Sequence, residues 1–322
     1  MKRIAIVGSG YMGGGMAQVF ALAGYPCSLA DVDEDTARTG RRRLVAEADR
    51  FESAGLFPAG ASDRVAANIL AAASIEEAVT EADYIAEVVP EDLNVKGVTL
   101  KRIGRAAPSR AIIATNTSAI SISTLAAFVV NPERFLGVHW MNPAPFVPSV
   151  EIIPSAQTSR EVVDVVEAML DGVGKVPTRA SDSAGFVANR LQFALFREAA
   201  LIVEEGLSTT QSVDEIVSNS FGFRLPFFGP FAIADMAGLD VYAGAFATLE
   251  ATLGDRFSTP ESLHSLVQAG NLGVKSGAGY ANYEAGSAAE LVAGRDRAYV
   301  ALESLRRDLR SSAMGVDLAP GG

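Results

Sequence analysis

The segment Gly137–Glu151, GVHWMNPAPFVPSVE, holds two residue types that together can move a proton. His139 is one of 2 histidines in the chain, and Glu151 lies twelve residues beyond it. A carboxylate beside an imidazole fixes the tautomer of the ring and raises its basicity, which makes a general base. A lone histidine can also be a core residue bonded to backbone, so the interpretation depends on the surrounding elements.

The sequence between the two residues predicts how they could meet. Three prolines lie there: Pro143, Pro145 and Pro148. Because proline lacks an N–H and resists helix, we expect a shaped loop. Apolar, β-prone residues flank the loop at 135–138 and 150–153, so His139 should end one strand and Glu151 should open another. A strand–loop–strand of this kind can fold back and bring the imidazole within hydrogen-bonding reach of the carboxylate.

The N-terminal 31 residues predict a strand, a glycine-rich turn, a helix and a second strand. Residues 3–7, RIAIV, form a short, mostly apolar strand that breaks into GSGYMG. A helical run then extends to Leu22, and a strand at 27–30 ends at Asp31. Such a GxGxxG turn suits a dinucleotide. Its three glycines have separate roles. Gly8 permits a tight turn, Gly10 lets the pyrophosphate approach the backbone, and Gly13 lets the helix pack closely on the sheet.

The residue at the end of the second strand predicts which dinucleotide is bound. The helix N-terminus offers free N–H groups to the phosphates. Asp31 would accept hydrogen bonds from the adenosine ribose and would repel a 2′-phosphate, so the pattern favours NAD over NADP.

Polar residues also follow the next predicted strands. Glu87 interrupts the strand at 83–89, and Asn116-Thr117-Ser118 follows the strand at 110–114. In an open α/β sheet ligands bind at the carboxyl ends of the strands, so Glu87, Ser118 and His139 should converge on one crevice. The remaining elements of this half are predicted as helices at 34–54, 62–72 and 159–172 and a short strand at 175–179.

The pattern changes near Ser183, beyond which the chain is predicted to be helical. Helices are expected at 186–205, 211–219, 230–252, 260–269 and 288–311. The fold class is therefore α/β: a Rossmann-type doubly wound sheet in residues 1–183, followed by an all-helical domain in residues 184–322.

Composition excludes several classes of partner. The formal charge is 27 − 38 = −11 without a basic stripe, which disfavours nucleic acid and anionic membrane surfaces. Arg41-Arg42-Arg43 is either a solvated helix face or a site for a substrate phosphate. The single cysteine, Cys27, cannot form an intramolecular disulfide, and no metal site is predicted. Without a signal peptide or an uninterrupted run of about eighteen apolar residues, we expect a cytoplasmic protein.

Six motifs, in order and at compatible spacings, are spread over nearly the whole length of the chain. They are IAIVGSGYMGGGMA at 4–17, ATNTSAISI at 114–122, HWMNPAPFVPSVEII at 139–153, AGFVANRL at 184–191, GPFAIADMAGLDVY at 229–242 and GVKSGAGYANY at 273–283. With these motifs the chain resembles the NAD-dependent 3-hydroxyacyl-CoA dehydrogenases. The resemblance implies an enzyme that oxidises the hydroxyl of a 3-hydroxyacyl-CoA or related 3-hydroxy acid to the keto form by hydride transfer.

The resemblance also implies roles for individual residues. His139 would remove the hydroxyl proton with Glu151 as its charge partner, Ser118 would bond the substrate oxygen, and Asn189 would help hold it. Cofactor contacts are implied for Gly8, Gly10, Tyr11, Met12, Gly13, Asp31, Glu87, Lys96, Asn116, Ser118 and Asn142. A homodimer formed through the helical domain is implied as well.

Three departures from the acyl-CoA members leave the substrate open. Residues 44–55 carry a single cation where acyl-CoA members usually have lysines near the CoA tail. The loop 222–229 is longer than usual and contains Arg224, and Trp140 and Asp92 replace commoner residues. The chain therefore also resembles the offshoots of the family that act on L-gulonate, carnitine or an aldehyde-bearing pyridine carboxylate, in which Arg224 would pair with a substrate carboxylate.

Two further hypotheses differ in class. One is a crystallin-like structural protein that keeps the dinucleotide fold without turnover, which the retention of Ser118, His139, Glu151 and Asn189 disfavours. The other is a dehydrogenase of the 6-phosphogluconate or 3-hydroxyisobutyrate type, whose acid–base group is a lysine in the second domain. The segment that holds His139 and Glu151 disfavours it.

Overall fold

The computed structural model describes residues 1–284 and 287–311. The chain divides into two compact units, Met1–Leu195 and Phe196–Gly322. We call them the sheet unit and the helical unit.

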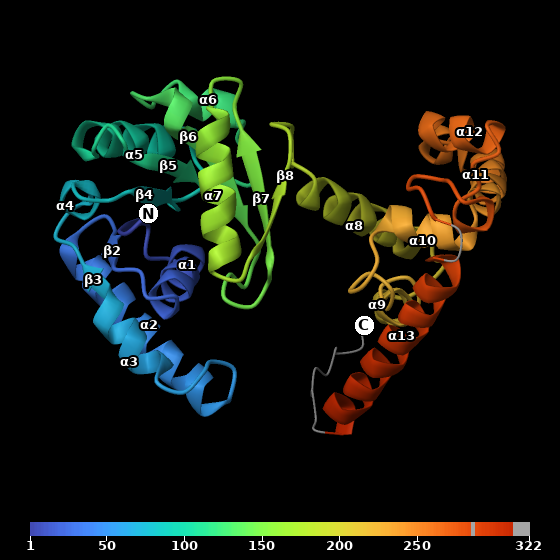
Figure 1. The fold of residues 1–322 in the computed structure, drawn as a ribbon, viewed down its shortest axis with the longest axis horizontal. Helices are drawn as coiled ribbons and strands as arrows, with labels where there is room; N and C mark the ends of the chain where they lie inside the picture. The colour runs from blue at the N-terminus through green and yellow to red at the C-terminus, as the bar shows by residue number, and fades with distance from the viewer. Residues whose placement is uncertain (285–286, 312–322) are drawn as a thin grey trace. The chain divides into compact units, whose positions relative to one another are not determined.

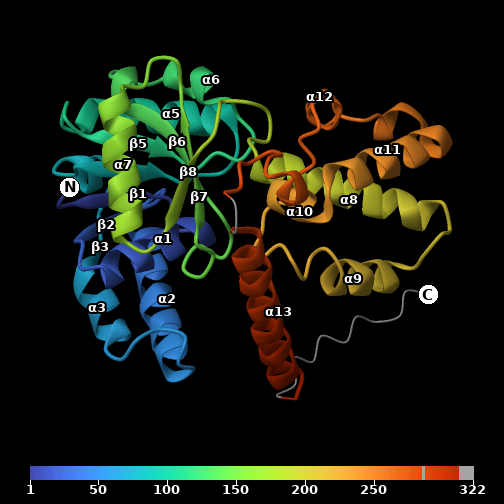
Figure 2. The ribbon, with the colours of Figure 1, turned by 45° about the vertical axis from the view of Figure 1, so that its right-hand side comes forward.

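The sheet unit is built on one eight-stranded sheet (Figure 1). Its strands are β1 (Ile4–Val7), β2 (Cys27–Ala30), β3 (Ile69–Ala71), β4 (Tyr84–Glu87), β5 (Ile112–Thr115), β6 (Phe135–Trp140), β7 (Ser149–Pro154) and β8 (Val176–Arg179). They lie in the order β3-β2-β1-β4-β5-β6-β7-β8. Neighbouring strands are parallel except β6 and β7, which are antiparallel and lie side by side in Figure 2.

Helices cover both faces of this sheet, and they are α1 (Tyr11–Leu22), α2 (Glu34–Ser53), α3 (Ala61–Asn68), α4 (Ile75–Val79), α5 (Leu93–Ala106), α6 (Ile122–Ala126) and α7 (Arg160–Gly172), with the 3-10 turn η1 at Pro132–Arg134. Ile4 and Ile6 pack in one core with residues of α1, α2, α3 and α7, whereas Ala5 and Val7 pack in a second core with α4, α5 and α6. Because both faces are buried, the central strands are apolar at every position rather than alternating. The predicted doubly wound α/β class is confirmed.

The structure corrects the prediction for residues 62–72. The expected helix ends at Asn68, and Ile69–Ala71 form the edge strand β3, which pairs with β2. A three-residue strand at a sheet edge has too few positions to show a period of two, so its sequence could not distinguish it from the end of the helix. The short helices α4 and α6 were not predicted either.

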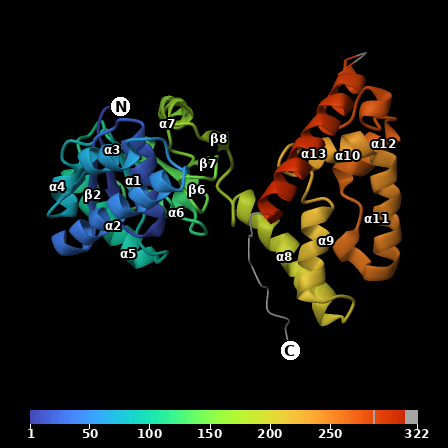
Figure 3. The same cartoon turned by 90° about the horizontal axis from the view of Figure 1, so that it is seen from below.

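The helical unit contains most of α8 (Ala188–Glu204), together with α9 (Thr210–Asn219), α10 (Pro230–Ala237), α11 (Leu239–Leu253), α12 (Glu261–Gln268), α13 (Ser287–Ser311) and the 3-10 turns η2 (Gly254–Phe257) and η3 (Val274–Ser276). The helix predicted at 230–252 is broken in two. Gly238 has a φ of 102° at the break, a conformation that favours glycine and ends α10. Arg306 of α13 bonds to Ser218 and Asn219 at the end of α9, beside which α13 runs in Figure 3.

Asp235 anchors the chain that follows α12. Its carboxylate is buried and accepts hydrogen bonds from the N–H groups of Tyr280 and Ala281 and from the hydroxyl of Tyr283. A Cβ on Gly279 would lie 2.3 Å from Asp235 Oδ1, so only glycine fits there. The motif GVKSGAGYANY therefore has a structural role in tying this tail to α10.

No single helix within residues 1–284 and 287–311 has the length and apolar character needed to cross a bilayer. The segments Pro230–Ala237 and Leu239–Phe257 are long and apolar enough only if they are counted together, and the chain bends by 102° between them.

Candidate active site

His139 and Glu151 are brought together by the pairing of β6 with β7. The two residues are direct partners in the antiparallel register, so their side chains leave the sheet on the same face. His139 Nδ1 lies 2.8 Å from Glu151 Oε2, and both side chains are buried. The predicted hydrogen bond is therefore present. The prediction placed each residue at a strand end, and the strands in fact extend one or two residues further.

The second oxygen of the Glu151 carboxylate holds the start of α8. Oε1 accepts hydrogen bonds from the N–H groups of Val187 and Ala188, at 3.0 and 2.9 Å. These are N–H groups that a helix cannot satisfy internally, and the helix dipole favours a negative charge beside them. Both oxygens of Glu151 are thus fixed, one by a ring and one by a helix terminus.

This arrangement determines which ring nitrogen of His139 is available. With Nδ1 donating to the carboxylate, the lone pair of the neutral ring lies on Nε2, which can accept a proton. The ring of Phe186 packs 5.5 Å from the His139 ring, centroid to centroid, and limits its rotation. The geometry suits general base catalysis.

The glycine-rich turn between β1 and α1 has the geometry that a pyrophosphate requires. Gly8 has a φ of 112°, and a Cβ there would lie 2.5 Å from the carbonyl oxygen of Val88. A Cβ on Gly13 would lie 2.0 Å from the Gly8 carbonyl oxygen, so the helix could not pack on the turn with any larger residue. Apart from its chain neighbours, no described residue has an atom within 4 Å of a Cβ built on Gly10, which leaves space in front of the first turn of α1. Tyr11 and Met12 open that turn, and α1 has no side-chain cap.

Asp31 lies at the floor of a pocket of about 510 Å³ beside this turn. Its Oδ2 accepts hydrogen bonds from the N–H and the hydroxyl of Ser9, both at 2.6 Å, and Oδ1 accepts one from the N–H of Val32. Arg43 also lines the pocket and donates to the carbonyls of Ser9 and Gly10. The pocket lies next to the glycine-rich turn and is lined by the carboxylate of Asp31, an arrangement that suits the adenosine of a dinucleotide.

The arginine run Arg41-Arg42-Arg43 has three different environments. Arg41 donates to the carbonyls of Ala66 and Ile69 and holds α3 and β3 on α2. Arg42 is exposed and bonds to Thr39, whereas Arg43 faces the adenosine-sized pocket. The three arginines therefore form neither of the two predicted arrangements, a solvated helix face or a single site for a substrate phosphate.

Glu87 and Lys96 differ from the expectation. Glu87 is 0% exposed and Lys96 is 1% exposed, and Lys96 Nζ donates to Glu87 Oε1 at 2.9 Å. The Glu87 carboxylate also accepts from the Thr115 hydroxyl and the Val89 N–H. A polar side chain inside a sheet covered on both faces must find a partner, so this pair bonds internally and neither group is displayed to a ligand.

Glu91 is the residue of this cluster that sequence reasoning passed over as part of a turn. It accepts hydrogen bonds from the Thr117 hydroxyl and from the N–H groups of Ser118 and Ala119, and its Oε2 lies 3.4 Å from Lys96 Nζ. Partial burial alone would raise the pKa of Glu91, but the bond from Thr117 and the charge of Lys96 outweigh it and lower that pKa. Glu91 therefore shapes the Asn-Thr-Ser segment, a contact between separate elements that no local pattern in the sequence indicates.

The remaining predicted site residues of the sheet unit lie around the ends of β5 and β6. Asn116 Oδ1 accepts from the Trp140 N–H at 2.9 Å, which ties the two strand ends together. Asn189 Nδ2 donates to the Ser118 carbonyl oxygen at 3.2 Å, so the start of α8 contacts the Asn-Thr-Ser segment. Asn142 is exposed in the loop that follows β6.

Arg224 belongs to the helical unit, whereas His139 belongs to the sheet unit. Arg224 lines a pocket of about 250 Å³ with residues of α10 and α13. Arg295, Asp296 and Tyr299 are the polar residues that α13 contributes, and the Tyr299 hydroxyl is a buried oxygen without a hydrogen-bond partner in the described part of the chain.

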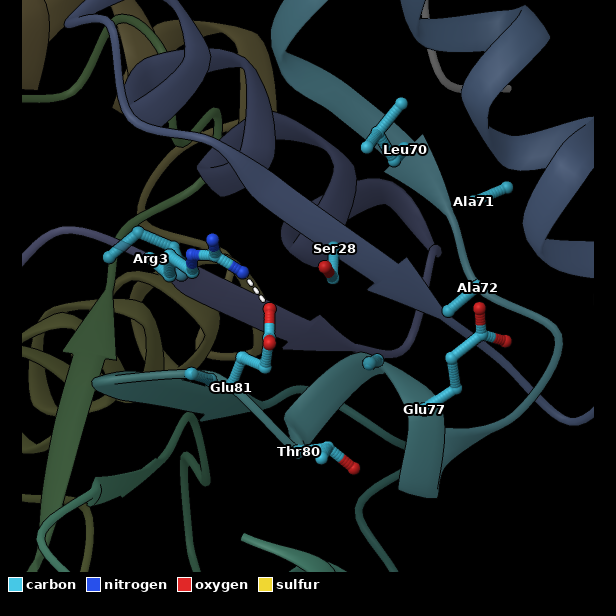
Figure 4. Close-up of a pocket in the computed structure, with 11 residues that line it drawn as sticks. Arg3, Ser28, Leu70, Ala71, Ala72, Glu77, Thr80 and Glu81 are labelled. Carbon is cyan, nitrogen blue, oxygen red and sulfur yellow. Dashed lines mark hydrogen bonds and ion pairs between the residues drawn. The ribbon is translucent and has the colours of Figure 1, made fainter. Parts of the chain in front are cut away.

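Another pocket, drawn in Figure 4, lies away from the candidate site. It occupies about 440 Å³ beside Arg3, Ser28 and Glu81, and Arg3 pairs with Glu81 across it. Ile4 at the amino end of β1 lines it, whereas the glycine-rich turn follows the carboxyl end of that strand. No cluster of three or more histidine, cysteine or carboxylate side chains suited to a metal occurs in residues 1–284 and 287–311.

Two family models match consecutive parts of the chain. The NAD-binding domain of 3-hydroxyacyl-CoA dehydrogenase matches residues 3–183, and the C-terminal domain of the same family matches residues 185–283.

Individual relatives and solved structures match most of the chain. A probable 3-hydroxybutyryl-CoA dehydrogenase of Bacillus subtilis is 35% identical over 285 residues, which are 88% of this chain and 98% of the relative. The 5-formyl-3-hydroxy-2-methylpyridine 4-carboxylate 5-dehydrogenase of Mesorhizobium japonicum is 32% identical over 95% of this chain and 98% of the relative. The crystal structure of a 3-hydroxyacyl-CoA dehydrogenase of Archaeoglobus fulgidus matches with a TM-score of 0.77 and 30% identity, over 96% of this chain and 99% of that one.

The two family matches together cover nearly all of the described residues, and the dinucleotide turn, Asp31 and the histidine–carboxylate pair lie within the first of them. The chain belongs to the 3-hydroxyacyl-CoA dehydrogenase family, the NAD-dependent oxidoreductases that act on CH–OH groups.

Proposed function

We propose that this enzyme oxidises the hydroxyl of a 3-hydroxyacyl-CoA, or of a related 3-hydroxy acid, to the keto form with His139 as the general base. The observation that carries the proposal is the 2.8 Å bond between His139 Nδ1 and Glu151 Oε2, together with the two N–H groups that fix the other carboxylate oxygen. A ring held in this way keeps Nε2 free and correctly oriented for a substrate hydroxyl.

His139 would couple two bond changes at the carbinol carbon. An alcohol C–H is a poor hydride donor until its O–H proton is leaving, so the base accepts that proton on Nε2 while the C–O bond becomes a carbonyl. NAD, when bound, accepts the hydride and its two electrons. The Ser118 hydroxyl and the Asn189 amide would hold the substrate oxygen as charge develops on it.

Several features of the sheet unit support the NAD contacts. The open space before Gly10, the uncapped start of α1 and the pocket that contains Asp31 form a continuous series for pyrophosphate, ribose and adenine. We therefore propose that Gly8, Gly10, Tyr11, Met12, Gly13 and Asp31 bind the cofactor, and that Asn116, Ser118 and Asn142 surround its nicotinamide end.

Replacing His139 by Gln tests the proposed base. We expect His139→Gln to bind NAD normally and to lose about 10²- to 10⁴-fold in kcat, which is the usual contribution of a general base. His264→Gln is the matched control, because the other histidine of the chain is exposed on α12 and bonds to Gln268. NADH formation would be followed with 3-hydroxybutyryl-CoA and with free 3-hydroxybutyrate. Wild-type turnover in His139→Gln would remove His139 from the mechanism.

A second candidate substrate class, a small carboxylate without CoA, is favoured by an acidic pocket lined by α2 and α3. In acyl-CoA members of the family this helix pair usually carries lysines near the CoA tail. In this chain Asp49, Glu52 and Asp63 line a pocket of about 630 Å³ at the same helices. Hydrogen bonds from the N–H groups of Ser62 and Gly60 lower the pKa of Glu52, which keeps it charged. The phosphates of CoA would meet repulsion on this surface.

The pocket that contains Arg224 supports the same class. No partner is recorded for the Arg224 guanidinium in the described part of the chain, and Arg295 and the unpaired Tyr299 hydroxyl line the same pocket. A carboxylate would suit Arg224, since guanidinium groups bind carboxylates through two parallel hydrogen bonds. Arg295 already pairs with Asp296, which lines the same pocket, so the proposal rests on Arg224 and the Tyr299 hydroxyl.

A substrate panel separates the two classes. L-gulonate, carnitine and a pyridine carboxylate with an aldehyde group would be compared with the CoA thioester. For a small carboxylate, Arg224→Ala should raise KM about tenfold or more, as loss of a charged hydrogen bond implies. Arg297→Ala, an exposed arginine of α13, is the control. An unchanged KM in Arg224→Ala would eliminate this role.

We also propose a homodimer formed through the helical domain, with the domain boundary at Ser183. The domain boundary is supported by the family matches, of which the first ends at residue 183 and the second begins at residue 185. The compact units divide later, after Leu195 within α8. Large apolar side chains exposed on the helical unit support the dimer; they include Phe196, Leu207, Ile216, Phe231, Val241 and Val300. Sedimentation equilibrium at micromolar concentration would detect it, and a monomer would contradict it.

A further inference from the structure

Lys175 is a buried lysine without a carboxylate partner. It precedes β8, its exposed fraction is 4%, and no ion pair of Lys175 is recorded in the described part of the chain. Burial lowers the pKa of its ammonium group. A buried ammonium costs free energy unless all of its donors are used.

The ammonium group donates to three carbonyl oxygens of one loop. Lys175 Nζ lies 2.6 Å from the oxygen of Ala144, 3.3 Å from that of Pro145 and 2.9 Å from that of Val147. An ammonium has three donors, so the three carbonyls use them fully. It also lies 5.4 Å from the ring centroid of Trp140, the residue after His139.

The loop between β6 and β7 has few other ways to satisfy these carbonyls. Its prolines supply no N–H, and the bonds recorded inside it are from Phe146 and Val147 to the Pro143 carbonyl. Among the described residues, no backbone N–H donates to the three carbonyl oxygens that accept hydrogen bonds from Lys175. Lys175 thus replaces the backbone ladder that a proline-rich segment cannot form.

The other side of the loop rests on the dinucleotide helix. A Cβ on Gly15 of α1 would lie 2.9 Å from Pro145 Cδ and 3.1 Å from Ala144 Cβ, so helix and loop are in direct contact. Asn142, a proposed cofactor contact, lies two residues before Ala144. The loop is held between the first helix and Lys175.

We propose that Lys175 is a positioning residue that fixes the 142–147 loop against α1 and thereby sets the affinity for NAD. This rests on the proposed function, in which Asn142 reaches the nicotinamide end of the cofactor. The His139–Glu151 bond depends instead on the β6–β7 register, so Lys175 affects cofactor binding far more than proton transfer.

The test replaces Lys175 by Met, which keeps the length of the side chain and removes its donors. We expect Lys175→Met to raise KM for NAD about tenfold or more, as loss of charged hydrogen bonds implies. The kcat at saturating NAD and its pH profile should stay close to wild type. Lys101→Met is the matched control. It removes a lysine of α5 whose ammonium lies over the Phe128 ring, and it should change neither KM for NAD nor kcat.

A second readout reports the position of the loop. Trp140 is the single tryptophan of the chain and is buried beside the ammonium. Quenching of its fluorescence by acrylamide should increase in Lys175→Met if the loop loosens. Should that variant fail to fold, Lys175→Arg keeps the charge, but its planar fork cannot meet three carbonyls around one nitrogen, so KM for NAD should still rise.

A wild-type KM for NAD in a folded Lys175→Met or Lys175→Arg variant overturns the proposal. A fall in thermal stability with an unchanged KM also overturns it, because that result describes a structural lysine. Failure of the proposed function would be separate: an active His139→Gln would remove the base and leave the effect of Lys175 on KM for NAD as it was.

Discussion

Glu151 of the sheet unit and Asp235 of the helical unit are both buried carboxylates whose oxygens are saturated with hydrogen bonds, yet they hold different things. Glu151 holds an imidazole on one side and the start of a helix on the other. Asp235 holds two backbone N–H groups and the hydroxyl of Tyr283. Burial and saturation therefore do not distinguish a candidate site carboxylate from a structural one. The nature of the partner does, since a neutral imidazole can act as a general base and a backbone N–H or a tyrosine hydroxyl cannot.

Glu151→Gln should have the larger effect on turnover. The amide can still accept from the start of α8, but its NH₂ would then face His139 Nδ1 and disfavour the tautomer with a free Nε2. We expect kcat to fall about 10²- to 10⁴-fold, as when a carboxylate that fixes a catalytic histidine is lost. Steady-state kinetics at saturating NAD measures this. Glu161→Gln, an exposed glutamate of α7, is the control, and equal activities of the two variants would contradict the role of Glu151.

Asp235→Asn should affect stability more than activity. An amide has one acceptor oxygen for three donors, and each buried group left unsatisfied costs about 1–3 kcal/mol. Burial and then the Asp235 bond raise the pKa of Tyr283 to about 12 in the native protein, and part of this shift should disappear in the variant. Thermal unfolding and spectrophotometric tyrosine titration would measure the two effects. A loss of kcat comparable to that of Glu151→Gln, without loss of stability, would remove the distinction between the two carboxylates.

Asp182 extends the comparison to a carboxylate that is only partly buried. Burial alone would raise its pKa, but bonds from the N–H and hydroxyl of Ser123, the Ile122 N–H and the Ser121 hydroxyl lower it overall. A depressed folded-state pKa contributes stability above the unfolded value near 3.8, and this contribution is lost as the pH falls through the folded-state pKa.

The expected effect of Asp182→Asn is therefore the smallest of the three and depends on pH. The variant should be less stable than wild type near neutrality, and the difference should shrink below about pH 4. Chemical denaturation at several pH values would measure it. A constant difference across the acidic range would show that the charge of Asp182 makes no contribution.

How far the sequence predicts this protein depends on whether a feature is local. The turn at Gly8–Gly13 and the acid at the end of β2 could be predicted, because they are set by residues a few positions apart. The pairing of His139 with Glu151 could also be anticipated, since both lie on strands joined by one loop. Glu87 was predicted to face the crevice at the strand ends, but its carboxylate is buried, and this burial depends on β1 and β5 on either side of β4.

The sequence by itself determined the class of the sheet, the dinucleotide turn and the pairing of His139 with Glu151, because glycine spacing, proline content and apolar runs act over short distances. Only the tertiary structure decided that Lys96 turns inward to Glu87, that Glu91 holds the Asn-Thr-Ser segment and that Lys175 supports the loop after His139. These contacts join residues from separate elements, and whether a charged side chain is exposed or buried depends on what packs over it and not on its neighbours in the chain.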